Sequence, residues 1–138
     1  MVAIVKDRDT QQRSGNVRAF PVAQNSRLWA GTIACLNPAG RLTPAVTAPD
    51  LKCVGVTRAT INNDPGASGA ITGEAMLGVF GPFANSSAGD AITLADIGAD
   101  CFIVDNQTVA KTSASATRSV AGKVFDVDVN GVWVNFVL

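Results

Sequence analysis

Side chains capable of acid–base or metal chemistry are scarce in this chain of 138 residues. It contains no histidine and no tyrosine, so the usual general base, the commonest metal ligand and any Ser-His-Asp or Cys-His arrangement are missing. Asp126 and Asp128 stand two positions apart and could share a cation or act as an acid pair on one strand face. No further oxygen ligand is implied nearby, so a solvated strand face is the favoured interpretation. We therefore predict no enzymatic activity, no metal and no cofactor.

A second group of distinctive residues lies near the N-terminus. Residues 1–30 include five lysines and arginines against two aspartates, although the formal net charge of the whole chain is zero. Residues 1–27 are polar and lack periodicity before Val17, which predicts an extended arm joined to a body at residues 28–138. The cations are spread out, with no interleaved aromatic residues. Docking on a protein is therefore favoured over binding a nucleic acid, with a merely solvated arm close behind.

The candidate contact residues of the arm are its arginines and the aromatic residues near its junction with the body: Arg8, Arg13, Arg18, Phe20 and Trp29. Phe20 and Val22 should fix the end of the arm on the body. Trp29 could equally contact a partner or belong to the core.

The body has the composition of an all-β fold. Its length corresponds to one domain, and 47% of the residues are apolar, which is ordinary for a soluble protein. Short apolar runs alternate with turn residues and frequent glycines, which predicts a small β-barrel or β-sandwich with very little helix. The one helix signal spans Thr93–Gly98, where Thr93 could cap a single turn.

Three cysteines, Cys35, Cys53 and Cys101, lie inside apolar runs and form no C-x-x-C pair. This pattern favours buried free thiols in a reducing compartment over a disulfide or a metal role. The N-terminus lacks the basic and apolar regions of a secretory signal, and no apolar run approaches the span of a bilayer. We expect the protein to be made in a cytoplasm, with no membrane partner.

Residues Gly31–Thr57 are repeated in pattern by Gly98–Val124, displaced by 67 positions without a gap. Each copy contains an apolar run, a turn, a short strand, a polar loop and a strand with a glycine, Gly55 in one copy and Gly122 in the other. Repeated units of this kind predict a barrel with approximate internal two-fold symmetry. The repeat leaves out the segment before Leu28 and the last strand.

The C-terminal residues predict a β-hairpin. Asn130-Gly131 separates two apolar runs and is the preferred dipeptide of a two-residue type I′ turn. Such a turn would pair Val129 with Val132, Val127 with Val134 and Phe125 with Phe136 on a buried face. Asp126 and Asp128 would then pair with Asn135 and Trp133 on the opposite face.

Four segments carry a resemblance over nearly the whole chain: KDRDTQQRSGNVRAFPVA, LWAGTIACLNPAGRLTPA, ADIGADCFIVDNQTVAKTSASATRSVAGKV and DVDVNGVWVNF. They resemble small proteins encoded beside the major capsid protein in Mu-like and related tailed phages. The chain is similar also to the wider group of phage capsid decoration, or cement, proteins with a small β-barrel or β-sandwich body. The likeness is one of segments and their order and includes no catalytic motif.

This resemblance implies a structural virion protein on the outer surface of the head. Its partners would be the major capsid protein and two further copies of itself, as a homotrimer at threefold positions, and it would stabilise the expanded head. Assembly would take place in the cytoplasm of a bacterial host. A head-fibre or receptor- or glycan-binding module on the virion is the alternative, although two tryptophans and no tyrosine give it few aromatic residues. A hydrolase using aspartates and a shell-forming subunit are less favoured.

Overall fold

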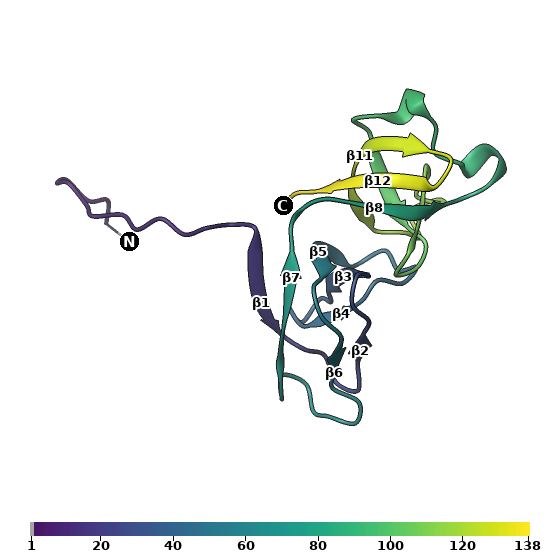
Figure 1. The fold of residues 1–138 in the computed structure, drawn as a ribbon. Helices are drawn as coiled ribbons and strands as arrows, with labels where there is room; N and C mark the ends of the chain where they lie inside the picture. The colour runs from purple at the N-terminus through teal and green to yellow at the C-terminus, as the bar shows by residue number, and fades with distance from the viewer. Residues whose placement is uncertain (1) are drawn as a thin grey trace.

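The computed structural model describes residues 2–138 and is all-β, as the sequence predicts. The strands form two units that follow one another along the chain, residues 17–77 and residues 78–138 (Figure 1). Residues 2–16 precede both units as an extended arm that leaves the body. The two units share one body, and strand β7 of the first unit leads directly into β8 of the second.

The first unit contains a five-stranded sheet with the order β1-β7-β5-β3-β4. Its ends meet because Val22, just after β1, bridges Leu42 of β4 in parallel. A small two-stranded sheet, β2-β6, lies beside it. The strands are β1 (Val17–Pro21), β2 (Arg27–Leu28), β3 (Ile33–Leu36), β4 (Leu42–Pro44), β5 (Lys52–Thr57), β6 (Ile61–Asn62) and β7 (Thr72–Met76).

The second unit is a closed five-stranded barrel with the order β10-β8-β12-β11-β9. Two single-turn 3-10 helices, η1 (Ala88–Asp90) and η2 (Leu94–Asp96), lie between its first two strands, and Thr93 is the N-cap of η2 as expected. The strands are β8 (Gly78–Asn85), β9 (Asp100–Ile103), β10 (Thr108–Ala110), β11 (Val120–Asp128) and β12 (Gly131–Phe136).

The repeat read from the sequence is present in the hydrogen-bonding register. In the first unit Cys35 pairs with Cys53, and in the second Phe102 pairs with Val120, each 67 positions further on. A register shift lies at the same place in both copies. Hydrogen bonds outside the strands are also repeated 67 positions further on. The Gly31 amide donates to the Thr57 carbonyl, and the Gly98 amide donates to the Val124 carbonyl, both at 2.9 Å.

The repeat also extends further than the sequence pattern indicates. Strand β1 corresponds to β8, and β7 corresponds to β12, because Phe20 pairs with Gly73 as Phe83 pairs with Val132. The prediction that the repeat leaves out the segment before Leu28 and the last strand is therefore wrong. The loops that join these strands to the rest differ in length between the copies, so a gapless comparison does not detect them.

Two groups of buried apolar side chains form the core. The smaller group fills the first unit and includes Phe20, Leu28 and Leu42. The larger group fills the barrel of the second unit. It also includes side chains on the outer face of β3 and β5, among them Ile33 and Val56. Because side chains alternate along a strand, β3 directs Ala34 into the first unit and its neighbours toward the second. The two units are therefore packed together by apolar burial.

The boundary of the arm differs from the predicted one. Val17–Pro21 form β1 and pair with β7, while Val22 and Leu28 are fully buried. The arm therefore ends at Asn16 and not at residue 27. Local periodicity does not reveal this strand, because β1 is short and its partner β7 lies at the opposite end of the first unit in the sequence.

The register of the C-terminal hairpin also differs from the prediction. Asp128 pairs with Gly131 and Val127 with Val132, so the loop residues are Val129 and Asn130. Gly131 has a φ of 140° in the strand, and a Cβ there would collide with the Phe83 carbonyl oxygen. A bulge between Val124 and Asp126 then turns Phe125 outward, 56% exposed, and removes it from the expected pairing with Phe136.

Candidate functional site

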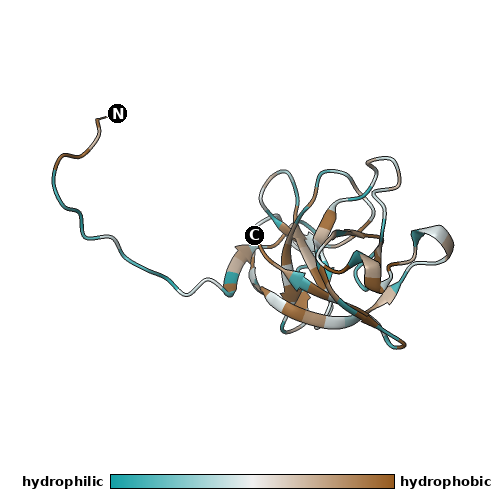
Figure 2. Cartoon of the chain, turned by 90° about the horizontal axis from the view of Figure 1, so that it is seen from above, coloured by the Kyte–Doolittle hydropathy of each residue, from teal (hydrophilic) through white to brown (hydrophobic). Residues whose placement is uncertain are grey.

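The arm is the most exposed part of the structure. Every side chain from residue 2 to residue 16 is exposed, and no strand or helix is formed before Val17. In Figure 1 the arm leads away from the body, and in Figure 2 it is hydrophilic along most of its length and hydrophobic near its N-terminal end. The hydrophobic end contains Val2, Ile4 and Val5, which are 95%, 66% and 98% exposed. We call residues 2–5 the apolar tip.

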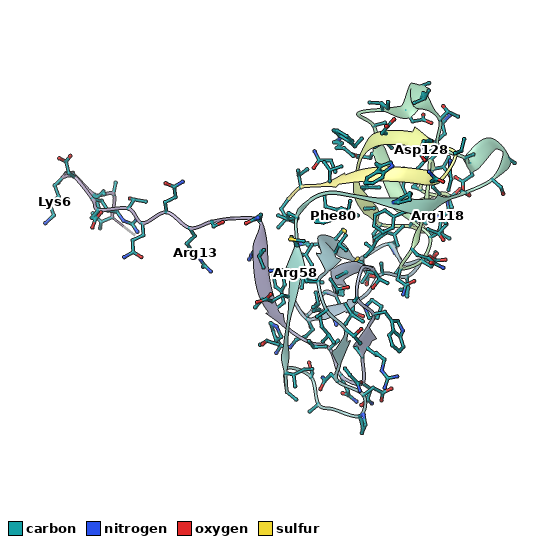
Figure 3. All side chains as sticks on the ribbon, viewed as in Figure 1. Lys6, Arg13, Arg58, Phe80, Arg118 and Asp128 are labelled. Atoms are coloured by element: carbon teal, nitrogen blue, oxygen red, sulfur yellow. The ribbon has the colours of Figure 1, made fainter. Side chains whose placement is uncertain are left out.

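Charged residues follow the apolar tip. Lys6, Arg8 and Arg13 are exposed on the arm together with two aspartates, and Figure 3 shows Lys6 and Arg13 on the arm, outside the body. Within residues 2–138 none of these three cations forms an ion pair. By contrast, four cations of the body pair with carboxylates: Arg58 with Glu74, Lys111 with Asp96, Arg118 with Asp90 and Lys123 with Asp100. The cations of the arm are thus free to meet a partner.

Arg18 and Phe20 lie on β1, at the root of the arm. The Arg18 guanidinium stacks on the Phe20 ring, 4.9 Å from its centroid, and Arg18 borders a small hollow with Arg13, Ser14 and Gly15. Phe20 itself is 8% exposed and belongs to the core of the first unit. Phe20 is therefore a packing residue and is removed from the predicted contact residues, whereas Arg8, Arg13 and Arg18 remain.

Trp29 lies apart from the arm root, directly after β2, and its side chain is 54% exposed. The Arg27 guanidinium lies over its ring, 5.4 Å from the centroid. The Trp29 carbonyl accepts hydrogen bonds from the hydroxyls of Thr32 at 2.7 Å and Thr57 at 2.6 Å, which fixes the backbone below the ring. Trp29 is therefore outside the core, and its ring is accessible to a partner.

A groove of about 570 Å³ lies at the root of the arm. It is lined by the end of the arm, the β7–β8 junction and the C-terminal end of the chain: Gly15, Asn16, Arg18, Leu77, Gly78, Asn135, Phe136, Val137 and Leu138. Val137 and Leu138 are 56% and 69% exposed, so the groove has an apolar rim. Sequence reasoning missed it because only the fold brings the root of the arm and the C-terminus together (Figure 1).

The two aspartates of the hairpin are engaged in local hydrogen bonds. Asp128 accepts from the Asn130 amide at 2.7 Å and from the Trp133 indole at 3.3 Å, and Asp126 accepts from the Val127 amide at 2.8 Å. Within residues 2–138 there is no cluster of three or more His, Cys, Asp or Glu side chains that could hold a metal ion. The pair thus has the geometry of an exposed strand end and turn.

Comparisons of the chain with protein-family models, curated proteins and solved structures returned no match. In the part of the chain that the structure describes, no helix has the length and apolar character needed to cross a bilayer. The candidate site consists of the apolar tip, the charged stretch from Lys6 to Arg13 and the groove at the root of the arm.

Proposed function

We propose that this chain is a structural protein of a phage head, which attaches to the outer surface of the capsid through its N-terminal arm and stabilises the expanded head. The observation that carries the proposal is the arm, which exposes residues 2–16 and ends in the apolar tip. Burying such a tip on another protein is favourable by about 25 cal/mol per Å² of apolar surface removed from water.

The charge of the arm supports a protein partner over a nucleic acid. Residues 2–16 contain three cations and two carboxylates, so little net charge is available to release counterions from a phosphate backbone. Mixed charge beside an apolar tip suits a protein surface that offers an apolar cleft with carboxylates around it. Arg18 and Arg27 belong to the body, so the arm itself carries less positive charge than residues 1–30 as a whole.

The resemblance to decoration proteins supplies the identity of the partner. The major capsid protein would receive the arm, and the protein itself would be present as three copies at threefold positions of the head. Three arms acting together would bind far more firmly than one, because the second and third contacts form at a high effective concentration. The alternative, a receptor- or glycan-binding module, is supported by one observation, the exposed Trp29 with Arg27 above it.

Removal of the arm tests the proposal directly. A chain without residues 2–16 should fold as the full chain does, because that segment forms no strand and buries no side chain. Mixed with expanded heads that lack the protein, the full chain should bind in a fixed ratio to the capsid protein, and the shortened chain should lose about tenfold or more in affinity. Sedimentation of heads with bound protein, followed by quantification on a gel, measures both.

Two variants of the full chain identify which part of the arm is responsible for binding to the heads. One replaces Val2, Ile4 and Val5 with serine, and the other replaces Lys6, Arg8 and Arg13 with serine. If the serine variant of the tip loses binding at every salt concentration, the tip contributes apolar contacts. If the serine variant of the cations loses binding only at low salt, the cations contribute electrostatic contacts, which salt screens. Equal binding by the shortened and full chains would refute the role of the arm, and a loss of binding in Trp29→Ala alone would favour the alternative.

A further inference from the structure

Two of the three cysteines lie directly opposite each other on neighbouring strands. Cys35 of β3 and Cys53 of β5 are register partners in the first sheet, so their side chains leave the sheet on the same face. Directly opposite residues have Cβ atoms about 4.5–5.5 Å apart, and a disulfide requires about 3.5–4.5 Å. A small approach of the two strands would therefore bring the sulfur atoms within bonding distance.

The backbone beside the thiol pair is irregular. The register of β3 and β5 shifts between Ala34 and Cys35, where the ladder is irregular. Gly55 lies opposite Ala34 with a φ of 120°, and its lack of a side chain brings the Met76 backbone close. The thiol pair thus lies beside a bulge, a place where strands bend and twist more than elsewhere.

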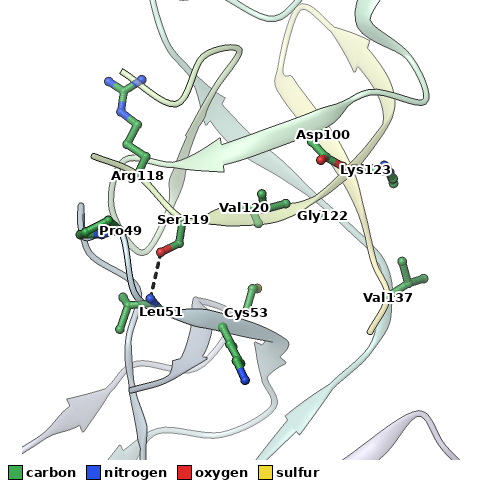
Figure 4. Close-up of a pocket in the computed structure, with 12 residues that line it drawn as sticks. Pro49, Leu51, Cys53, Asp100, Arg118, Ser119, Val120, Gly122, Lys123 and Val137 are labelled. Atoms are coloured by element: carbon green, nitrogen blue, oxygen red, sulfur yellow. Dashed lines mark hydrogen bonds and ion pairs between the residues drawn. The ribbon is translucent and has the colours of Figure 1, made fainter. Parts of the chain in front are cut away.

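The two thiols differ in access to solvent. Cys35 is fully buried, whereas Cys53 is half-buried and lines a groove of about 450 Å³ between the two units. Figure 4 shows Cys53 on one side of this groove and Ser119 and Val120 on the other. A small reagent could therefore reach Cys53 first, with Cys35 behind it.

The pKa values of the two thiols also indicate that Cys53 reacts before Cys35. The neighbouring Cys35 thiol lowers the pKa of Cys53 below its ordinary value. The same contact, together with burial, raises the pKa of Cys35. Because a thiolate is the attacking species in thiol–disulfide exchange, Cys53 is the more reactive of the two.

We propose that Cys35 and Cys53 form a redox site that a small disulfide, such as oxidised glutathione, converts into an intramolecular disulfide. The Cys53 thiolate attacks one sulfur of glutathione disulfide and releases one glutathione thiolate, leaving a mixed disulfide on Cys53. Cys35 then gives up its proton, attacks the Cys53 sulfur and releases the second glutathione. Two protein thiols are oxidised to one disulfide, and one glutathione disulfide is reduced to two thiols.

Cys101 does not share this site. It is fully buried and hydrogen-bonds the Gly122 carbonyl at 3.5 Å, and burial raises its pKa to about 12. In the repeat, Cys101 corresponds to Ala34, on the inward face of its strand. The positions that correspond to Cys35 and Cys53 are Phe102 and Val120, so the second unit repeats the pairing without the thiols.

The test uses the full chain, reduced and then incubated with glutathione buffers of increasing oxidising strength. Remaining thiols are alkylated under denaturing conditions, and peptides are mapped by mass spectrometry. We expect a single product with two hydrogen atoms fewer, a Cys35–Cys53 crosslink and an alkylated Cys101. The oxidised protein should also unfold at a higher urea concentration than the reduced one, and dithiothreitol should reverse the shift.

Two variants serve as matched controls. Cys101→Ser should oxidise like the wild type, and Cys53→Ser should form no intramolecular disulfide. The proposal is overturned if all three thiols of the wild type remain alkylatable, if Cys53 stops at the mixed disulfide with glutathione, or if the crosslink involves Cys101 or a second chain. This inference does not depend on the proposed function, since it needs no capsid.

Discussion

Phe20 is a predicted contact residue that lies on the first strand of the body, with the Arg18 guanidinium over its ring. Its burial in the first unit decides the matter. Phe20→Ala should lower the free energy of unfolding by about 3–5 kcal/mol, as removal of a core phenylalanine usually does. Urea unfolding measures this loss, and the folded fraction should still bind heads at full strength. Intact stability with lost binding would return Phe20 to the contact residues.

Gly55 has a role that no other residue can fill. Its φ of 120° disfavours any side chain, and a Cβ there would collide with the Met76 carbonyl oxygen. Gly55→Ala should therefore destabilise the protein by about 3 kcal/mol, combining strain and overpacking. Gly15→Ala is the matched control, because Gly15 has open space around it and should tolerate the change. Thermal unfolding of both variants separates the two cases, and equal stabilities would contradict this explanation.

Asp90 holds the loop before β11 in place. Thr112 donates to its carboxylate at 2.7 Å, Ser86 donates at 2.8 Å and the Arg118 guanidinium lies at 2.9 Å. These contacts, with Thr112 the largest, hold the pKa of Asp90 well below its ordinary value. A carboxylate with a lowered pKa in the folded state stabilises the protein above about pH 4, and this contribution is lost as the pH falls further.

Asp90→Asn should therefore cost about 2 kcal/mol at pH 7, because charged hydrogen bonds are lost. The difference from the wild type should shrink as urea titrations are repeated below pH 4. Asp64→Asn, at an exposed carboxylate, is the matched control and should change the stability little at pH 7. A stability difference that stays constant between pH 7 and pH 3 would show that the loss is one of packing and not of charge.

At the scale of elements, the sequence predicts connectivity better than register. The constant displacement between the two copies identifies β3–β5 and β9–β11 correctly, since both copies have loops of equal length. The predicted hairpin register is wrong, because local turn preference places Gly131 in the loop while its close approach to Phe83 requires it in the strand. Such an approach is a tertiary contact, and no pattern of neighbouring residues reveals it.

The sequence predicts the arm of the candidate site but not the root of the arm or the groove beside it. The polar and charged composition of the arm indicates an extended segment, and its arginines are exposed as expected. The position of its root is not predictable, because β1 is held by β7, a strand far along the chain. The groove beside Val137 and Leu138 likewise depends on the meeting of the arm root with the C-terminus, which only the complete topology determines.

At the scale of the whole molecule, the two units should unfold together. The larger group of core side chains spans both, and the buried Ser119 accepts from the Leu51 amide at 3.0 Å and donates to the Ala48 carbonyl at 2.5 Å. Calorimetry should show one transition with equal calorimetric and van't Hoff enthalpies. Ser119→Ala should lower its midpoint without splitting it. Two separate transitions would mean that each unit is stable alone.

The position of the C-terminus has a practical consequence. Leu138 lines the groove at the root of the arm, so a peptide fused to the C-terminus would emerge beside the segment proposed to hold the partner. Cargo displayed there should obstruct the proposed attachment. The loop at Val129–Asn130 lies at the other end of β12, and Val129 is fully exposed. Foreign epitopes inserted at that loop would lie on the side of the body away from the root of the arm.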